Sequence, residues 1–262
     1  MKIVSLLENS AARPDALTEH GLSLYLETEN RRILFDMGQT DRFARNAAAF
    51  GIDLSYVDLA VISHGHYDHG GGLSAFLAVN HHAPVYVHKD AFLPHYNGAG
   101  RFIGLDPALK DHPQIRLTED RTEIGEDLTL MTCNGLERPH SPGHFGLTER
   151  IGDDFIPDDF RHEQYLLLCE RTGGRRKRIL LSGCSHKGIV DITEWFSPDI
   201  LVGGFHVSKM PLDSKLKDMA LQLNTHETTF YTCHCTGVDQ YSFLQAHMER
   251  IHYLACGQII TI

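Results

Sequence analysis

Residues 64–69 read His-Gly-His-Tyr-Asp-His and place four metal-ligand side chains in six positions. They follow the apolar run 57–62 (Val-Asp-Leu-Ala-Val-Ile), which is short, rich in branched residues and predicts a buried strand. Three glycines, 70–72, and a helix-like segment at 73–77 come next. The ligand-type residues therefore lie on a loop at the C-terminal end of a strand, where open α/β layers commonly place their chemistry.

The spacing of these residues suits a site with two metal ions, one bound by the first two histidines and one by the last two residues. His64 and His66 are two residues apart, so in an extended segment both imidazoles point to the same side and can converge on one ion. Asp68 and His69 diverge unless the loop turns, in which case they can reach a second ion roughly 3.5–4 Å from the first. Imidazole and carboxylate ligands favour zinc, with iron or manganese as alternatives. A solvated histidine-rich loop is the simpler alternative, and the density of ligands disfavours it.

Composition limits the protein class. The chain has 262 residues, 42% of them hydrophobic, which supports one large α/β domain over residues 1–262. Its net charge of −10 argues against nucleic acid as a partner. The lack of a signal-like N-terminus, of a Cys-x-x-Cys pair and of an apolar run of ~18 residues predicts a cytoplasmic protein with reduced thiols and no membrane span. The basic run 171–178 is interpreted as a hairpin turn, with phosphate steering as the alternative.

Local patterns predict strands first and then alternating helices and strands, which fits one α/β domain with two or four layers. Residues 90–120 and 134–163 look irregular, and we expect the second segment to form a lid or binding loop. The expected strands are 3–7, 23–27, 32–35, 83–88, 128–133, 164–169, 178–182, 199–203 and 228–232, and the expected helices are 40–50, 188–196, 213–224 and 239–250.

Three further histidines lie at the C-terminal ends of apolar strands, as the first motif does. They are His186, His206 and His234. One such histidine alone is more often a hydrogen-bonded structural residue, but three in a chain that already carries residues 64–69 indicate ligands. We interpret the others outside the motifs as surface or helix-face residues, namely His20, His81, His82, His88, His95, His112, His162, His226, His247 and His252.

These segments carry a family resemblance. Residues 63–71 resemble the first metal motif of the metallo-β-lactamase superfamily, which implies an αββα sandwich with a one- or two-metal site at one edge of the sheets. Residues 183–190, 203–206 and 233–237, with 36–38, 158–160 and 163–164, resemble a subgroup of that superfamily. The subgroup is named for an archaeal dihydropterin–ribofuranosylaminobenzene 5′-phosphate synthase, and the resemblance spans residues 1 to about 257 in motif order.

The resemblance implies a ligand set for two divalent ions, most simply zinc. His206 and His234 compete for the last position, and His206 is also a candidate acid. Cys184 stands where the superfamily usually has a bridging Asp, so it is either a thiolate ligand or a small buried residue. His140 and His144 loosely echo the usual third motif and are expected in the lid. The implied metal ligands are His64, His66, Asp68, His69, Cys184, His186, His206 and His234.

Three functions follow as hypotheses. The first is a hydrolase of a phosphorylated or otherwise anionic small molecule through a metal-bound hydroxide, with Asp68 orienting the hydroxide and His206 protonating the leaving group. Lys187, His144 and the basic residues 175–178 would contact the anion. The second is a pterin-related transferase or synthase that releases phosphate or pyrophosphate. The third is a non-catalytic ligand- or metal-binding module. The oligomeric state stays open.

Overall fold

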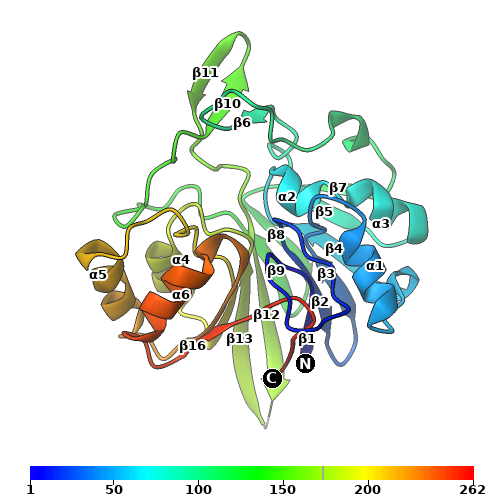
Figure 1. The fold of residues 1–262 in the computed structure, drawn as a ribbon. Helices are drawn as coiled ribbons and strands as arrows, with labels where there is room; N and C mark the ends of the chain where they lie inside the picture. The colour runs from blue at the N-terminus through cyan, green and yellow to red at the C-terminus, as the bar shows by residue number, and fades with distance from the viewer. Residues whose placement is uncertain (173) are drawn as a thin grey trace.

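Two central β-sheets lie face to face in this protein, and helices cover the outer side of each (Figure 1). The structure is a computed structural model that describes residues 1–172 and 174–262. The first sheet has the order β17-β1-β2-β3-β4-β5-β7. Its strands are β1 (Lys2–Leu7), β2 (Ser23–Glu27), β3 (Arg32–Phe35), β4 (Leu59–Ile62), β5 (Val85–His88), β7 (Ile115–Thr118) and β17 (Ile259–Thr261).

The second sheet has the order β16-β15-β14-β13-β12-β9-β8. Strands β13, β14, β15 and β16 run parallel to one another, so their C-terminal ends meet at one edge. Its strands are β8 (Arg121–Gly125), β9 (Leu128–Met131), β12 (Tyr165–Thr172), β13 (Arg175–Ser182), β14 (Ile200–Gly203), β15 (Thr229–Thr232) and β16 (Ile251–Tyr253).

Three apolar cores hold the layers together. One lies between the sheets and includes Phe35, Val61 and Leu181. The other two lie under the helices on each outer face, where burial of apolar side chains stabilises the packing. The helices are α1 (Arg42–Ala49), α2 (Tyr67–Gly70), α3 (Leu73–Val79), α4 (Ile189–Phe196), α5 (Ser214–Leu223) and α6 (Val238–Gln245), with short 3₁₀ turns η1 (Leu54–Tyr56), η2 (Pro107–Leu109) and η3 (His234–Thr236). The predicted αββα architecture is confirmed. No helix in the described ranges is long and apolar enough to cross a bilayer.

The two segments expected to be irregular are partly ordered as a third sheet, so that expectation was wrong. Strands β10 (Thr148–Ile151) and β11 (Asp154–Pro157) form a hairpin inside residues 134–163, and β10 pairs with β6 (His95–Tyr96). The hairpin stands above the two main sheets (Figure 1). These strands have two to four residues each, too few to show a hydrophobic period, and a pairing between distant segments holds them.

The basic run lies at the wrong end of a strand to bind substrate. Residues 175–178 begin β13, whereas the ligand-type residues follow its last residue, Ser182. The seven residue steps from Arg175 to Ser182 span about 23 Å, and the β12–β13 hairpin projects away from α2 (Figure 1). The interpretation of this run as a hairpin is confirmed by the β12–β13 pairing, although Gly173 in its turn lies outside the described residues. Phosphate steering by these residues is contradicted by their position.

Candidate metal centre

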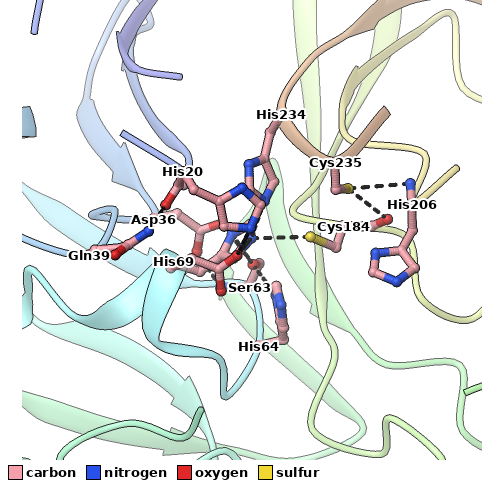
Figure 2. Close-up of polar contacts among 12 residues, drawn as sticks. His20, Asp36, Gln39, Ser63, His64, His69, Cys184, His206, His234 and Cys235 are labelled. Carbon is pink, nitrogen blue, oxygen red and sulfur yellow. Dashed lines mark hydrogen bonds and ion pairs between the residues drawn. The ribbon is translucent and has the colours of Figure 1, made fainter. Parts of the chain in front are cut away.

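Four loops from the two sheets bring the predicted ligands together. His64 and His66 follow β4, and helix α2 turns the chain so that Asp68 and His69 face the same region. The other ligands follow the parallel strands β13, β14 and β15, whose C-terminal ends meet at one edge. Figure 2 shows side chains from the two sheets pointing toward one another. Strand topology therefore gathers residues that lie up to 170 positions apart (64 to 234).

His64, His66 and His186 form a first candidate ligand set, referred to below as the first ligand set. Nε2 of His64 lies 3.3 Å from Nε2 of His186, and the His66 ring centroid lies 4.6 Å and 5.0 Å from the other two. All three side chains are buried. Burial, reinforced by the neighbouring imidazoles, holds the pKa of His64 and of His186 well below the ordinary value. These rings are therefore neutral, which is the form that binds a metal.

Asp68, His69 and His234 form a second candidate ligand set, referred to below as the second ligand set. Nε2 of His69 lies 3.2 Å from Nε2 of His234, and Asp68 Oδ2 lies 3.4 Å from the same His234 atom and 4.0 Å from that of His69. Burial alone would raise the pKa of Asp68, but the adjacent His69, His20 and His234 hold it well below its usual range. A carboxylate and two imidazoles thus converge on one point.

The proton positions on His64 and His69 follow from one buried carboxylate. Asp36 Oδ2 is 2.7 Å from His69 Nδ1, so that nitrogen carries the donated proton and Nε2 presents a lone pair. Ser63 Oγ donates to the same Oδ2 at 2.7 Å and therefore accepts from His64 Nδ1 at 2.8 Å. Because the proton of His64 is on Nδ1, its Nε2 also presents a lone pair. Asp36 thus orients one ligand from each set, as outer carboxylates do at metal sites.

Asn9 performs the same task for His234. Its Oδ1 accepts from the Gly21 backbone N–H at 3.2 Å, which assigns the amide orientation, and from His234 Nδ1 at 2.9 Å. The 3.2 Å contact between His69 and His234 therefore joins two lone pairs, which repel unless a cation lies between them.

The spacing of the ligand atoms fits such a cation. Tetrahedral zinc with ligands about 2.0–2.1 Å away separates them by about 3.3–3.5 Å. Three of the spacings, 3.2, 3.3 and 3.4 Å, are close to that range, and the fourth, 4.0 Å between Asp68 Oδ2 and His69 Nε2, is longer. The donor set therefore fits divalent metal.

Cys184 lies between the two ligand sets. Its Sγ is 3.1 Å from His69 Nε2, and it shares candidate metal-binding groups with His64 on one side and His234 on the other. Figure 2 shows the sulfur between His69 and the Cys235–His206 side of the centre. Burial raises the pKa of the Cys184 thiol, and a bound metal would offset that effect by stabilising the thiolate. The residue that replaces the expected Asp is thus placed where a bridging ligand would stand.

His206 lies on the outer side of the first set. Its ring centroid is 4.1 Å from that of His186, and it joins Cys184 and His186 in one candidate metal-binding group. Its Nδ1 is buried without a hydrogen-bond partner in the described chain, although the residue as a whole is partly exposed. Both predicted roles, ligand and proton donor, are compatible with this position.

Two further buried carboxylates hold the ligand loops in place. Glu163 accepts from the backbone N–H groups of His186 at 2.7 Å and Lys187 at 3.1 Å, and Glu8 accepts from that of His234 at 2.6 Å. The backbone at Asp36, Ser185, His206 and His234 is left-handed, with φ between 48° and 59°. Such conformations cost of order 1–3 kcal/mol each and persist where hydrogen bonds enforce them.

The environment of Lys187 does not suit the expected role in anion binding. Its ammonium is enclosed and donates to the carbonyls of Thr132 at 2.7 Å and Glu163 at 2.9 Å. Burial lowers the pKa of Lys187 to about 8. His144 is exposed, and its Nδ1 accepts from the Gly146 N–H, so its role at the substrate stays a prediction.

Several histidines expected at the surface are part of the centre or lie beside it. His20 Nε2 contacts Asp68 Oδ2 at 3.2 Å. His88, His95 and His162 are buried, so their assignment to the surface was wrong. Glu8 and Asn9 were not anticipated at all. Glu8 and Asn9 directly follow β1, and His162 lies just before β12, so a position beside a strand end was the one signal that could have drawn attention to them.

Similarity to known proteins agrees with this geometry. The model of the metallo-beta-lactamase superfamily matches residues 18–154. An uncharacterised protein of Methanocaldococcus jannaschii is 27% identical over 283 residues, covering 99% of this chain and 100% of its own. The 7,8-dihydropterin-6-methyl-4-(beta-D-ribofuranosyl)-aminobenzene-5'-phosphate synthase of the same organism is 25% identical over 290 residues, covering 99% and 96%.

Solved structures also match over the full length of the chain. One is described as a metal-dependent hydrolase of the beta-lactamase superfamily, with a TM-score of 0.84, 28% identity, and coverage of 100% of this chain and 99% of that one. Human tRNase Z, short form, shares the fold with a TM-score of 0.54 at 16% identity, over 100% and 99% of the two chains. Because the family model covers more than half of the chain and the likeness extends through the rest, this protein belongs to the metallo-beta-lactamase superfamily.

Proposed function

We propose that this protein is a hydrolase of a phosphorylated or otherwise anionic small molecule, dependent on two divalent ions, with zinc first among the candidates. The observation that carries the proposal is the pair of facing imidazole nitrogens, 3.3 Å apart in the first ligand set and 3.2 Å apart in the second. Divalent ions held there would polarise a phosphoryl or carbonyl oxygen and lower the pKa of water toward ~7.

The residues of the chain supply orientation and proton transfer. Asp68 is ionised and receives a hydrogen bond from His20, so one of its oxygens can orient the attacking water or hydroxide by accepting a hydrogen bond from it. His206 has a buried Nδ1 without a partner in the described chain and a ring that reaches the partly exposed side of the centre. We assign it the protonation of the leaving group.

The segment 134–163 supplies a wall for the substrate. The Phe145 ring centroid lies 5.0 Å from that of His206, and the Phe160 ring stacks on His186 at 4.4 Å. Aromatic faces beside a polar centre can hold a planar or apolar part of a substrate while its charged group reaches the metals. This contact supports the interpretation of residues 134–163 as a binding loop.

A pterin-related transferase is the second candidate. It is favoured by the likeness to the dihydropterin-type synthase, which extends over 99% of this chain and 96% of the relative. In that reaction the same centre would stabilise a leaving phosphate or pyrophosphate.

Activity and metal content test the proposal together. The wild-type protein is assayed for hydrolysis of generic phosphomonoesters and phosphodiesters, and bound metal is counted by elemental analysis. We expect His66→Ala to lose activity and metal, and His82→Ala, a change at an exposed histidine, to keep both. Turnover only with a ribosyl-aminobenzene phosphate and a pterin diphosphate would replace hydrolysis by the transferase. Full metal content without any turnover would refute both.

A further inference from the structure

A second group of buried polar side chains lies behind the first ligand set. His95 comes from β6, and Asp158 and His162 lie in the segment that leads into β12. Their exposed fractions are 0%, 2% and 1%. Burial of a carboxylate and two imidazoles is unfavourable unless their hydrogen bonds are satisfied, so this group needs an explanation beyond packing.

The hydrogen bonds of the group assign its protons. Asp158 Oδ1 accepts from the Phe160 backbone N–H at 2.8 Å, and its Oδ2 is 3.0 Å from His95 Nδ1 and 3.2 Å from His162 Nε2. The Gly65 backbone N–H donates to His162 Nδ1 at 2.9 Å, so His162 carries its proton on Nε2 and donates it to Asp158. Asp158 is therefore an ionised acceptor at the centre of the group.

The same carboxylate faces His66. Nε2 of His66 lies 3.9 Å from Asp158 Oδ2, is buried, and has no hydrogen-bond partner among the described residues. A nearby carboxylate favours the tautomer in which the ring nitrogen that faces it is protonated. In His66 this nitrogen is Nε2, so the lone pair lies on Nδ1.

We propose that Asp158, supported by His95 and His162, is a positioning residue that holds the proton of His66 on Nε2, so that Nδ1 completes the first metal-binding set. The role rests on the metal-binding part of the proposed function and is independent of the substrate. It parallels the action of Asp36 on His69 and His64, because the second nitrogen of a metal-ligating histidine is usually fixed by an outer partner.

The geometry of the loop 64–66 shows that it packs directly against the group formed by His95, Asp158 and His162. Gly65 stands between the two histidine ligands, and its N–H is held by His162. A Cβ atom at Gly65 would lie 2.4 Å from the Ala91 carbonyl oxygen and 2.9 Å from His95 Nε2. The ligand loop therefore packs on the group, and a shift of Asp158 would reach His66 through both the hydrogen bonds and this contact.

A further metal ion inside the group is the alternative. His66, His95, Asp158 and His162 do place one ligand-type atom each within 4.8 Å of one another. However, His162 has one nitrogen that accepts from Gly65 and one that donates to Asp158, so it offers no lone pair to a metal. The hydrogen-bond pattern favours orientation of His66.

The test compares Asp158→Asn with Asp159→Asn, a matched change at the exposed neighbouring carboxylate. Zinc affinity is measured by competition with a chelator on the full-length protein, without substrate. We expect Asp158→Asn to weaken one of the two equivalents by about 10- to 100-fold, which is the usual effect of losing an outer partner. The other equivalent and the Asp159→Asn protein should keep the wild-type affinities.

A spectroscopic readout separates positioning from a general loss of structure. The ¹⁵N shifts of His66 in the metal-free protein report which nitrogen is protonated, and we expect Nε2 in the wild type and a shift toward Nδ1 in Asp158→Asn. If Asp158→Asn does not fold, His162→Gln, which can still accept from Gly65 and donate to Asp158, should retain tight binding, whereas His162→Leu should weaken one equivalent.

Unchanged affinities, equal weakening of both equivalents, or loss of a third equivalent would overturn the proposal. A wild-type protein that binds two zinc ions but hydrolyses nothing would refute the proposed hydrolase while leaving the role of Asp158 intact.

Discussion

Replacing Asp36 by Asn gives the sharpest test of how this centre is organised. The Asp36 carboxylate accepts three hydrogen bonds of 2.7 Å, from the Ser63 N–H, the Ser63 hydroxyl and His69 Nδ1. Asn tolerates the left-handed backbone at this position, where φ is 59°. The substitution therefore changes charge and hydrogen bonding with little change in shape.

The expected loss follows from counting these bonds. The Asn oxygen can still accept from the Ser63 N–H, but its NH₂ group then faces the Ser63 hydroxyl and His69 Nδ1. Two hydrogen bonds to a charged group, worth roughly 1.5–3 kcal/mol each, are replaced by neutral ones worth roughly 0.5–1.5 kcal/mol each, so the metal-free protein should lose about 2–3 kcal/mol of unfolding free energy.

Metal binding should fall as well, because His69 is driven to the tautomer that has its proton on Nε2. The Ser63 hydroxyl, now an acceptor from Asn, would donate to His64 Nδ1 and drive that ring the same way. We expect both zinc affinities to drop by about 10- to 100-fold, or about 1.4–2.8 kcal/mol each.

Chemical denaturation of the metal-free protein and zinc competition on the folded protein measure the two effects separately. Asp58→Asn is the matched control, because Asp58 is exposed and accepts from the Arg32 N–H at 2.7 Å outside the centre. The reasoning about tautomers is wrong if Asp36→Asn loses stability but binds both zinc ions as tightly as the wild type.

Three other substitutions test the supports of the centre. Glu163→Gln should cost about 1.5–3 kcal/mol in denaturant unfolding, because an amide NH₂ would face a backbone N–H or the Tyr165 hydroxyl, which now donates to Glu163 at 2.6 Å. Lys187→Met should remove a pH dependence. The pKa of Lys187 is about 8 in the folded protein and about 10.4 unfolded, so the unfolded chain binds more protons between these pH values and stability rises with pH there, by about 3 kcal/mol for this group. A difference between wild type and variant that is flat from pH 8 to 10.5 would contradict this. Gly203→Ala should lower the melting temperature sharply, since its Cβ would lie 1.7 Å from the Ser182 carbonyl oxygen, whereas Gly135→Ala, with open space around it, should not.

Much of the fold could be predicted because local patterns and tertiary packing agree. Strands β2 and β3 have the predicted ends, and α1 differs from its predicted range by one or two residues at each end. The differences arise where a distant partner decides the boundary. Strand β13 begins at Arg175 because its charged first half pairs with β12. Helix α6 ends at Gln245 because the chain must turn back into the three-residue strand β16.

The candidate ligands could be predicted from the sequence, but the contacts that orient them could not. Residues 64–69 carry four ligand-type residues, three His and one Asp, at a recognisable spacing, and the strand ends indicated His186, His206 and His234. Asp36, Asp158 and Glu163 lie in segments that carry the family resemblance, but their contacts could not be read from it. Asn9 and His95 lie in no recognisable motif, because an outer partner is defined by the atom it reaches and not by its neighbours in the chain.

The sequence by itself determined the order of the elements, the layered fold, the family and the residues able to bind metal, since these depend on residue type and on patterns within a few positions. Only the tertiary structure decided which of them face one another. In the tertiary structure Cys184 lies between the two ligand sets, and Lys187 is enclosed. Residues 175–178 lie at the end of β13 away from the centre, and Asp36 and Asp158 contact the outer nitrogens of the candidate ligands. The physical reason is that a proton position or a metal site is a matter of contacts of about 3 Å between atoms, and parallel strand pairing, not sequence distance, brings these atoms together.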